Sequence, residues 1–177
     1  FLDDAFTVLD TIAGGAGTDV LKIDEAGQDE IIVLADFTNV TSVETLTAGT
    51  TTGLAGNLGA LASTAGITTV TFADTGASDS LTIDAEFAND LTVNLGGGTD
   101  KLDASALTKT LTVAATETFF DAVNHTVTGG TGTADELSVT ADGTNIDIAS
   151  MTTLTAFEKL TIANDAASGA IAFDSLT

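Results

Sequence analysis

The sequence predicts an all-β fold, a parallel β-solenoid of the β-roll or β-helix kind, in which short strands stack rung over rung. Triads of an apolar, a polar and an apolar residue recur along the chain, and four of them begin at positions 81, 91, 102 and 111. Glycine, asparagine and aspartate separate the triads and favour turns. The chain has no proline, so no backbone N–H is lost to the hydrogen bonds between rungs.

The triads have the alternation of strands with one apolar face, and they are rich in residues that favour strands. An antiparallel β-sandwich is the alternative, but sandwich strands usually run longer and contain more aromatic residues than the 5% of this chain. The triads are Leu81-Thr82-Ile83, Leu91-Thr92-Val93, Leu102-Asp103-Ala104, Leu111-Thr112-Val113, Leu137-Ser138-Val139, Ile146-Asp147-Ile148, Leu160-Thr161-Ile162 and Ile171-Ala172-Phe173.

One stretch, residues 54–64, departs from this pattern. Its Leu54, Leu58 and Leu61 have helical spacing, which predicts a helical turn or a glycine-softened loop at one edge of the solenoid.

Two segments of the chain, about 14–49 and 129–165, match each other in frame. In both, an aspartate precedes a glycine by 8 residues, and farther on an apolar residue precedes a glutamate by 7. We interpret them as an internal duplication within one β-rich domain covering 1–177. Because the chain begins with Phe1 rather than Met, we expect it to be a fragment or a processed segment of a longer protein.

The charge and composition exclude several functions. There are 26 Asp and Glu against 4 Lys and Arg, a net charge of −22, so nucleic acids and anionic membrane surfaces are excluded as partners. The chain has no cysteine and one histidine, which rules out thiol nucleophiles and two-histidine metal sites. No apolar run approaches the roughly 18–20 residues that span a bilayer. We expect no enzyme activity.

A glycine-rich nonapeptide is the motif that points to chemistry. Residues 14–22 fit the pattern Gly-Gly-x-Gly-x-Asp-x-apolar-x, the calcium-binding repeat of parallel β-helices. Glycines permit a tight turn of backbone carbonyls, and the aspartate adds a carboxylate, which suits an ion that takes six to eight oxygen ligands.

Three partial copies of the motif follow, at 95–102, 129–137 and 74–81. The alternative is that all four are ordinary solenoid corners, where glycine and aspartate occur without a metal. The candidate calcium ligands in the four turns are Gly15, Gly17, Asp19, Gly76, Asp79, Gly96, Gly98, Asp100, Gly130, Gly132 and Asp135.

The copies are not in tandem, so each site has to complete its ligand shell from neighbouring rungs. Asp24, Asp84 and Asp103 are weaker candidates for this, because the frame Asp-x-Leu-x-Ile-Asp places the second aspartate at the far end of a strand. Glu44 and Glu158 hold matching positions in the two duplicated segments. Each is a calcium ligand, an interface contact or a solvated residue.

The remaining polar and aromatic features have structural interpretations. His125 stands beside a glycine-rich turn and is expected at the surface or in that turn, not as a catalytic base. Phe119 and Phe120 are expected to plug the core or cap the solenoid. The Thr-x-Thr pairs at 69/71, 110/112 and 126/128 are irregularly spaced, so β-propensity explains them better than an ice-binding array.

The four turns resemble those of the repeats-in-toxin (RTX) family of bacterial proteins exported by type I secretion. The phrase Gly-Gly-Ala-Gly-Thr-Asp-Val-Leu, followed by a Ser-Val-Glu-Thr-Leu strand, is similar to S-layer proteins and giant surface adhesins of that group. The resemblance implies calcium-triggered folding outside the cell, secretion, a cell-surface location and crystalline layers or adhesion.

Three functions follow as hypotheses. The first is a structural segment of an S-layer or extracellular filament, folded by Ca²⁺ and partnered by other copies of itself. The second is a calcium-stabilised adhesin or a carbohydrate- or ice-binding module, with cell-surface polysaccharide as partner. The third, a polysaccharide-cleaving enzyme, is disfavoured because the four lysines are scattered along the chain.

Overall fold

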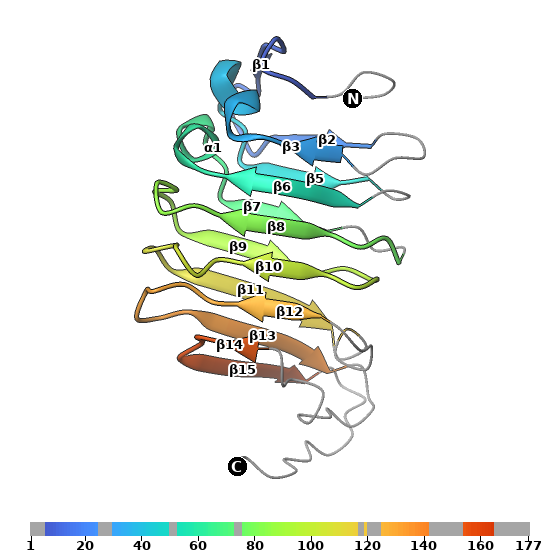
Figure 1. The fold of residues 1–177 in the computed structure, drawn as a ribbon, viewed down its shortest axis with the longest axis vertical. Coiled ribbons are helices and arrows are strands. Elements are labelled where there is room, and N and C mark those ends of the chain that lie inside the picture. The colour runs from blue at the N-terminus through green and yellow to red at the C-terminus, as the bar shows by residue number, and fades with distance from the viewer. Residues whose placement is uncertain are drawn as a thin grey trace.

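The chain forms a parallel β-solenoid in a computed structural model, which describes residues 6–24, 30–49, 53–72, 76–116, 119, 125–141 and 154–164. The backbone passes alternately through a seven-stranded and a six-stranded sheet, so each coil gives one strand to each (Figure 1). Every strand pair in the described residues is parallel. The solenoid prediction is therefore confirmed, and the antiparallel sandwich is excluded.

The strands are short, as the triads predict. The triads at 146–148 and 171–173 lie outside the described residues, and the other six overlap strands. The seven-stranded sheet contains β2 (Val20–Ile23), β5 (Thr45–Ala48), β7 (Thr69–Thr71), β9 (Leu91–Asn94), β11 (Leu111–Thr116), β13 (Glu136–Ala141) and β15 (Lys159–Asn164). The six-stranded sheet contains β3 (Glu30–Ile32), β6 (Leu54–Leu58), β8 (Ser80–Ile83), β10 (Lys101–Asp103), β12 (Thr126–Thr128) and β14 (Leu154–Thr155), and β1 (Ile12–Ala13) pairs separately with β4 (Val40–Thr41).

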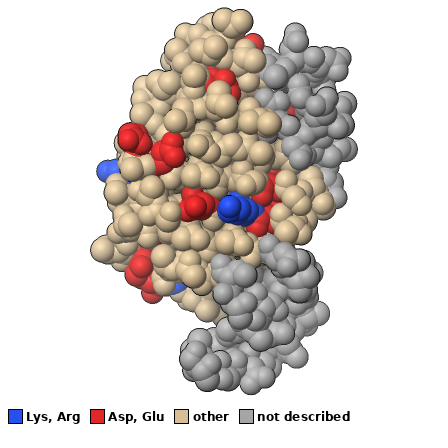
Figure 2. Space-filling model, viewed as in Figure 1, with Lys and Arg blue, Asp and Glu red and all other residues tan. Residues whose placement is uncertain are grey.

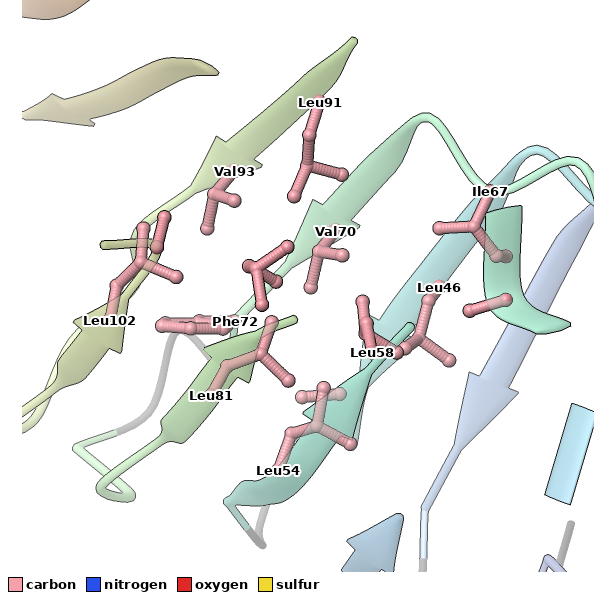
Figure 3. Close-up of a cluster of buried hydrophobic side chains, with 14 of the residues drawn as sticks. Leu46, Leu54, Leu58, Ile67, Val70, Phe72, Leu81, Leu91, Val93 and Leu102 are labelled. Carbon is pink, nitrogen blue, oxygen red and sulfur yellow. The ribbon is translucent and has the colours of Figure 1, made fainter. Parts of the chain in front are cut away.

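The core is a set of apolar columns between the two sheets. Strand alternation turns every second side chain inward, and in-register pairing stacks these side chains from rung to rung. Figure 3 shows residues such as Leu46 and Val93 of one sheet facing Leu54 and Leu102 of the other. One inward column of the seven-stranded sheet consists of Leu21, Leu46, Val70, Val93, Val113, Leu137 and Leu160.

Two helical insertions cover the N-terminal coils at one edge. The 3-10 helix η1 (Leu34–Asn39) and α1 (Ala60–Ala65) pack against each other (Figure 1). The ring of Phe6 meets that of Phe37 edge-on at a centroid distance of 5.3 Å. These contacts close the apolar core at that end of the described chain.

The helical interpretation of residues 54–64 is half right. A helical turn is present at Ala60–Ala65, but Leu54 and Leu58 belong to strand β6 and are both buried. Only Leu61 lies on the helix, and it is 39% exposed. The four-residue spacing of Leu54 and Leu58 did not distinguish the two structures, because residues four apart share one face of a strand as well as one face of a helix.

Replacing Leu46 with alanine should destabilise the solenoid far more than the same change at Leu160. The two leucines share one inward column, but Leu46 is 0% exposed and Leu160 is 44% exposed. We expect a loss of about 2–5 kcal/mol for Leu46→Ala and a clearly smaller loss for Leu160→Ala in denaturant unfolding. Equal losses would contradict this description of the core.

Candidate functional site

One residue at the start of each of β6, β8, β10 and β12 stands in a single column, the aspartate column; this residue begins β6 and directly precedes the other three strands. In-register pairing aligns Leu54, Asp79, Asp100 and His125, which come from successive coils. Two of the four candidate metal aspartates therefore lie on neighbouring rungs.

Each polar side chain in the aspartate column accepts a hydrogen bond from the backbone of the preceding rung. The N–H of Leu54 donates to Asp79 Oδ1 (2.6 Å), and the N–H of Asp79 donates to Asp100 Oδ1 (3.0 Å). The N–H of Asp100 donates to His125 Nδ1 (3.0 Å). The two aspartates are each 1% exposed and His125 is 5% exposed, so these bonds form away from solvent.

His125 takes the place of an aspartate in this column. Its turn position agrees with the sequence prediction, but it is buried rather than at the surface. Burial lowers the pKa of its imidazole, which favours the neutral form whose Nδ1 accepts the Asp100 N–H. The ring lies 3.7 Å from that of the buried Phe119, centroid to centroid. His125 thus has a structural role that no local pattern in the sequence indicates.

A second column, the carboxylate column, stands where the strands of the seven-stranded sheet begin. The N–H of Asp19 donates to Glu44 Oε2 (2.8 Å), and the N–H of Asp135 donates to Glu158 Oε2 (2.9 Å). The two glutamates therefore connect one rung to the next instead of only facing solvent. Their matching places in the two duplicated segments were the sequence signal for this role.

Both carboxylate oxygens of Asp135 accept backbone hydrogen bonds. Its Oδ1 accepts the N–H of Leu111 on the preceding rung (2.8 Å), and its Oδ2 accepts the N–H of Gly130 in its own turn (2.7 Å). The side chain is fully buried.

The turns at Asp19 and Asp135 also share a glycine contact. A Cβ on Gly14 would overlap the carbonyl oxygen of Ser42, and a Cβ on Gly129 would overlap that of Ala156. Ser42 and Ala156 both have a positive φ, 53° and 59°. The two segments that match in sequence thus form their corners with the same backbone geometry, and each corner needs glycine at that position.

The glycine-rich turns before Asp79 and Asp100 touch each other. A Cβ on Gly98, whose φ is +111°, would overlap the carbonyl oxygen of Ala77 in the preceding coil. These two turns are stacked although the motif copies are not in tandem. By contrast, the turns of Asp19 and Asp135 lead into β2 and β13, and four strands of the sheet lie between those two strands.

The weaker ligand candidates are Asp24, Asp84 and Asp103. Each lies at the opposite end of a strand from the aspartate that directly precedes that strand. Strand β2 separates Asp24 from Asp19, and Asp24 Oδ2 pairs with the ammonium of Lys22 (2.9 Å). Strand β8 likewise separates Asp84 from Asp79. Hydrogen bonds from the Ser105 side chain and backbone lower the pKa of Asp103.

The environment of Asp100 disfavours the charged form of its carboxyl group. Burial raises its pKa to about 7 and the nearby Asp79 carboxylate adds to the rise, while backbone N–H groups of Asp79 and Gly96 oppose it. Within the described residues, three buried side-chain atoms have no hydrogen-bond partner: Asp100 Oδ2, Asp19 Oδ2 and His125 Nε2. An unpaired buried carboxylate oxygen is costly, and a cation would offset that cost.

The described residues contain no cluster of three or more Asp, Glu, His or Cys side chains placed to hold a metal ion. A calcium ion at any of these turns would therefore need backbone carbonyls and water molecules to complete its ligand shell. Calcium accepts such ligands readily, and fewer carboxylates mean weaker binding.

No protein-family model, curated protein or solved structure matches the chain. None of the helices in the described ranges is long and apolar enough to cross a membrane. Function has to be argued from the columns and turns themselves.

Removing the Asp135 carboxylate should destabilise the protein even in chelator. Asp135→Ala leaves the N–H groups of Leu111 and Gly130 without acceptors, and each unsatisfied buried group costs about 1–3 kcal/mol. The matched control, Glu86→Ala, changes an exposed carboxylate and should shift stability by no more than about 0.5 kcal/mol. Equal unfolding midpoints for the two variants would show that the column does not stabilise the fold.

The stacking of the two glycine-rich turns can be tested with a pair of glycine variants. Gly98→Ala and Gly76→Ala both force alanine into a positive φ, which costs about 1–2 kcal/mol. Only the Gly98 variant also meets the Ala77 carbonyl, because nothing lies within 4 Å of a Cβ at Gly76. We expect the lower melting temperature for Gly98→Ala, and the reverse order would contradict the stacked geometry.

Proposed function

We propose that the chain is a structural segment of a secreted surface protein, of the S-layer or extracellular-filament kind, that calcium folds and assembles. The observation that carries this proposal is the aspartate column, where a buried, unpaired Asp100 oxygen stands in a glycine-rich turn stacked on a second such turn. A divalent cation would relieve the unpaired charge without adding a proton.

Four turns are the proposed calcium positions. Asp79 and Asp100 would supply carboxylates at one edge, and Asp19 and Asp135 would do so at the other, with backbone carbonyls of the turns completing the shells. Sites with so few carboxylates suit the affinities of extracellular calcium modules, about 10⁻⁴–10⁻³ M.

The negative net charge explains why the proposed folding would depend on calcium. A charge of −22 opposes compaction, so a chain without calcium is loose and suited to export. Outside the cell, an ion at ten times its dissociation constant contributes about 1.4 kcal/mol per site through RT ln(1 + [L]/Kd). Four such sites together would contribute slightly more than the roughly 5 kcal/mol at the lower end of small-domain stability.

The role proposed is non-catalytic. The single histidine, the most common general base, has its Nδ1 occupied by the backbone of Asp100. The proposed partners are other copies of the chain, because the columns repeat from rung to rung and β15, the outermost described strand at the end away from the helices, could pair with a further rung.

Calcium titration, followed by far-UV circular dichroism and light scattering, tests the proposal. We expect millimolar calcium, but not magnesium, to raise the melting temperature and then to produce ordered assemblies. Asp100→Asn should weaken the calcium response, whereas Glu86→Gln removes one exposed charge and should leave it unchanged. A chain indifferent to chelator would overturn the calcium proposal, and a calcium-stabilised chain that stays monomeric would overturn assembly.

A further inference from the structure

A groove of ≈ 660 Å³ lies along one edge of the outer face of the seven-stranded sheet. Threonines of three successive strands form its floor, and the loops that lead into β9 and β11 form its wall. The floor residues are Thr69, Thr92 and Thr112, and the wall includes Asn89, Asp90 and Lys109.

Strand register makes the floor regular where the sequence is not. Thr45, Thr69, Thr92 and Thr112 hold one register position on four successive strands. Loops of different length separate them in the chain, so the Thr-x-Thr pairs give no sign of the column. In the sheet the threonines recur at the inter-strand spacing of about 4.8 Å.

The hydroxyl groups of the floor are available to a ligand. In the part of the chain that the structure describes, the hydroxyls of Thr69, Thr92 and Thr112 make no hydrogen bond to the protein. By contrast, the hydroxyl of Thr71 already accepts a bond from the Asn94 amide (3.2 Å). The floor therefore presents a row of free donors and acceptors, one per rung.

The wall is held in place by the protein itself. The Asn89 amide donates to the carbonyls of Ser63 and Ile67 (2.9 and 3.0 Å), and the N–H of Thr110 donates to Asp90 Oδ1 (3.0 Å). These bonds fix the loops against the sheet, so the groove is formed before any ligand arrives.

The face around the groove is neutral in a chain that is strongly acidic. The outward residues of β5, β7, β9 and β11 are Thr45, Thr47, Thr69, Thr71, Thr92, Asn94, Thr112, Ala114 and Thr116, none of them charged. Charges begin at its borders, with Lys22 on β2 and with the ion pair of Glu136 and Lys159 (2.9 Å). The opposite sheet, nearer the viewer in Figure 1, carries Lys101 and Asp103 on one strand, and charged side chains are scattered over that view in Figure 2.

We propose that this threonine groove binds an extended, neutral, hydroxyl-rich saccharide chain that runs across the rungs. Free hydroxyls match such a ligand, and the wall's Asp90 and Lys109 cancel in net charge. The groove has no aromatic residue, so binding depends on repeated hydrogen bonds rather than on stacking. A flat ice surface fits less well, because the wall rises beside the floor.

Many copies of the groove together would bind a polysaccharide more tightly than one groove does. A groove without an aromatic anchor should bind one saccharide chain weakly, with a dissociation constant in the millimolar range. If copies assemble as proposed above, many grooves meet one polysaccharide surface and avidity raises the overall affinity. Binding to a single folded chain does not depend on the calcium turns, so the two proposals can fail separately.

Titration of the full ¹⁵N-labelled chain, folded in calcium, with cellohexaose, xylohexaose, mannohexaose and chitohexaose tests the groove by NMR. We expect at least one of these to shift the amide signals of Thr69, Thr92 and Thr112. Thr92→Val and the triple variant T69V/T92V/T112V keep strand-favouring side chains but remove hydroxyls, and the triple variant should weaken binding at least tenfold. The matched control, T82V/T128V on the opposite sheet, should bind like the native chain.

Several results would overturn the inference. These are the absence of shifts with all four saccharides, shifts confined to the six-stranded sheet, or unchanged binding by both Thr92→Val and the triple variant. Ice-crystal shaping without saccharide binding would assign the face to ice instead. Circular dichroism of each variant establishes that lost binding does not reflect lost folding.

Discussion

The hydrogen bond from the backbone at the start of one rung to a side-chain acceptor on the next rung is the interaction on which this structure depends. It recurs from Leu54 through Asp79 and Asp100 to His125 at one edge, and from Asp19 to Glu44 and Asp135 to Glu158 at the other. Strand ladders alone would leave these N–H groups unpaired at the corners. The side-chain acceptors satisfy them and connect neighbouring rungs where the chain turns.

The same arrangement explains why a strongly acidic chain buries carboxylates at all. Asp79, Asp100 and Asp135 are buried, and each accepts a hydrogen bond from a backbone N–H of the preceding rung, which compensates for part of the cost of burying the carboxylate. Asp135 uses both oxygens, whereas Asp100 keeps one unpaired and has a pKa of about 7. Structural and proposed metal-binding roles thus coincide in these aspartates, and the unpaired oxygen of Asp100 is the feature on which the proposed cation site rests.

Parallel, in-register stacking also decides what each face of the solenoid presents. Inward positions stack into apolar columns such as the one through Leu46 and Val93, and outward positions stack into the threonine column of the groove. A solenoid therefore converts a loosely repeated sequence into regular rows of like chemistry. This regularity underlies both the core and the saccharide site that we propose.

The sequence by itself determined the solenoid class, the strand triads, the absence of thiol and two-histidine chemistry, and the placing of Asp19, Asp79, Asp100 and Asp135 directly before strands. These features are local, since alternation, turn residues and composition act within a few neighbouring positions. Only the tertiary structure decided which glycine-rich turns touch and that Glu44 accepts a hydrogen bond from the N–H of Asp19. It also decided that His125 is a buried member of the aspartate column and that the threonines of the groove form one row. Each of these is a contact between coils 20 to 25 residues apart in the chain, and loop lengths that vary from coil to coil hide the register until the rungs are stacked.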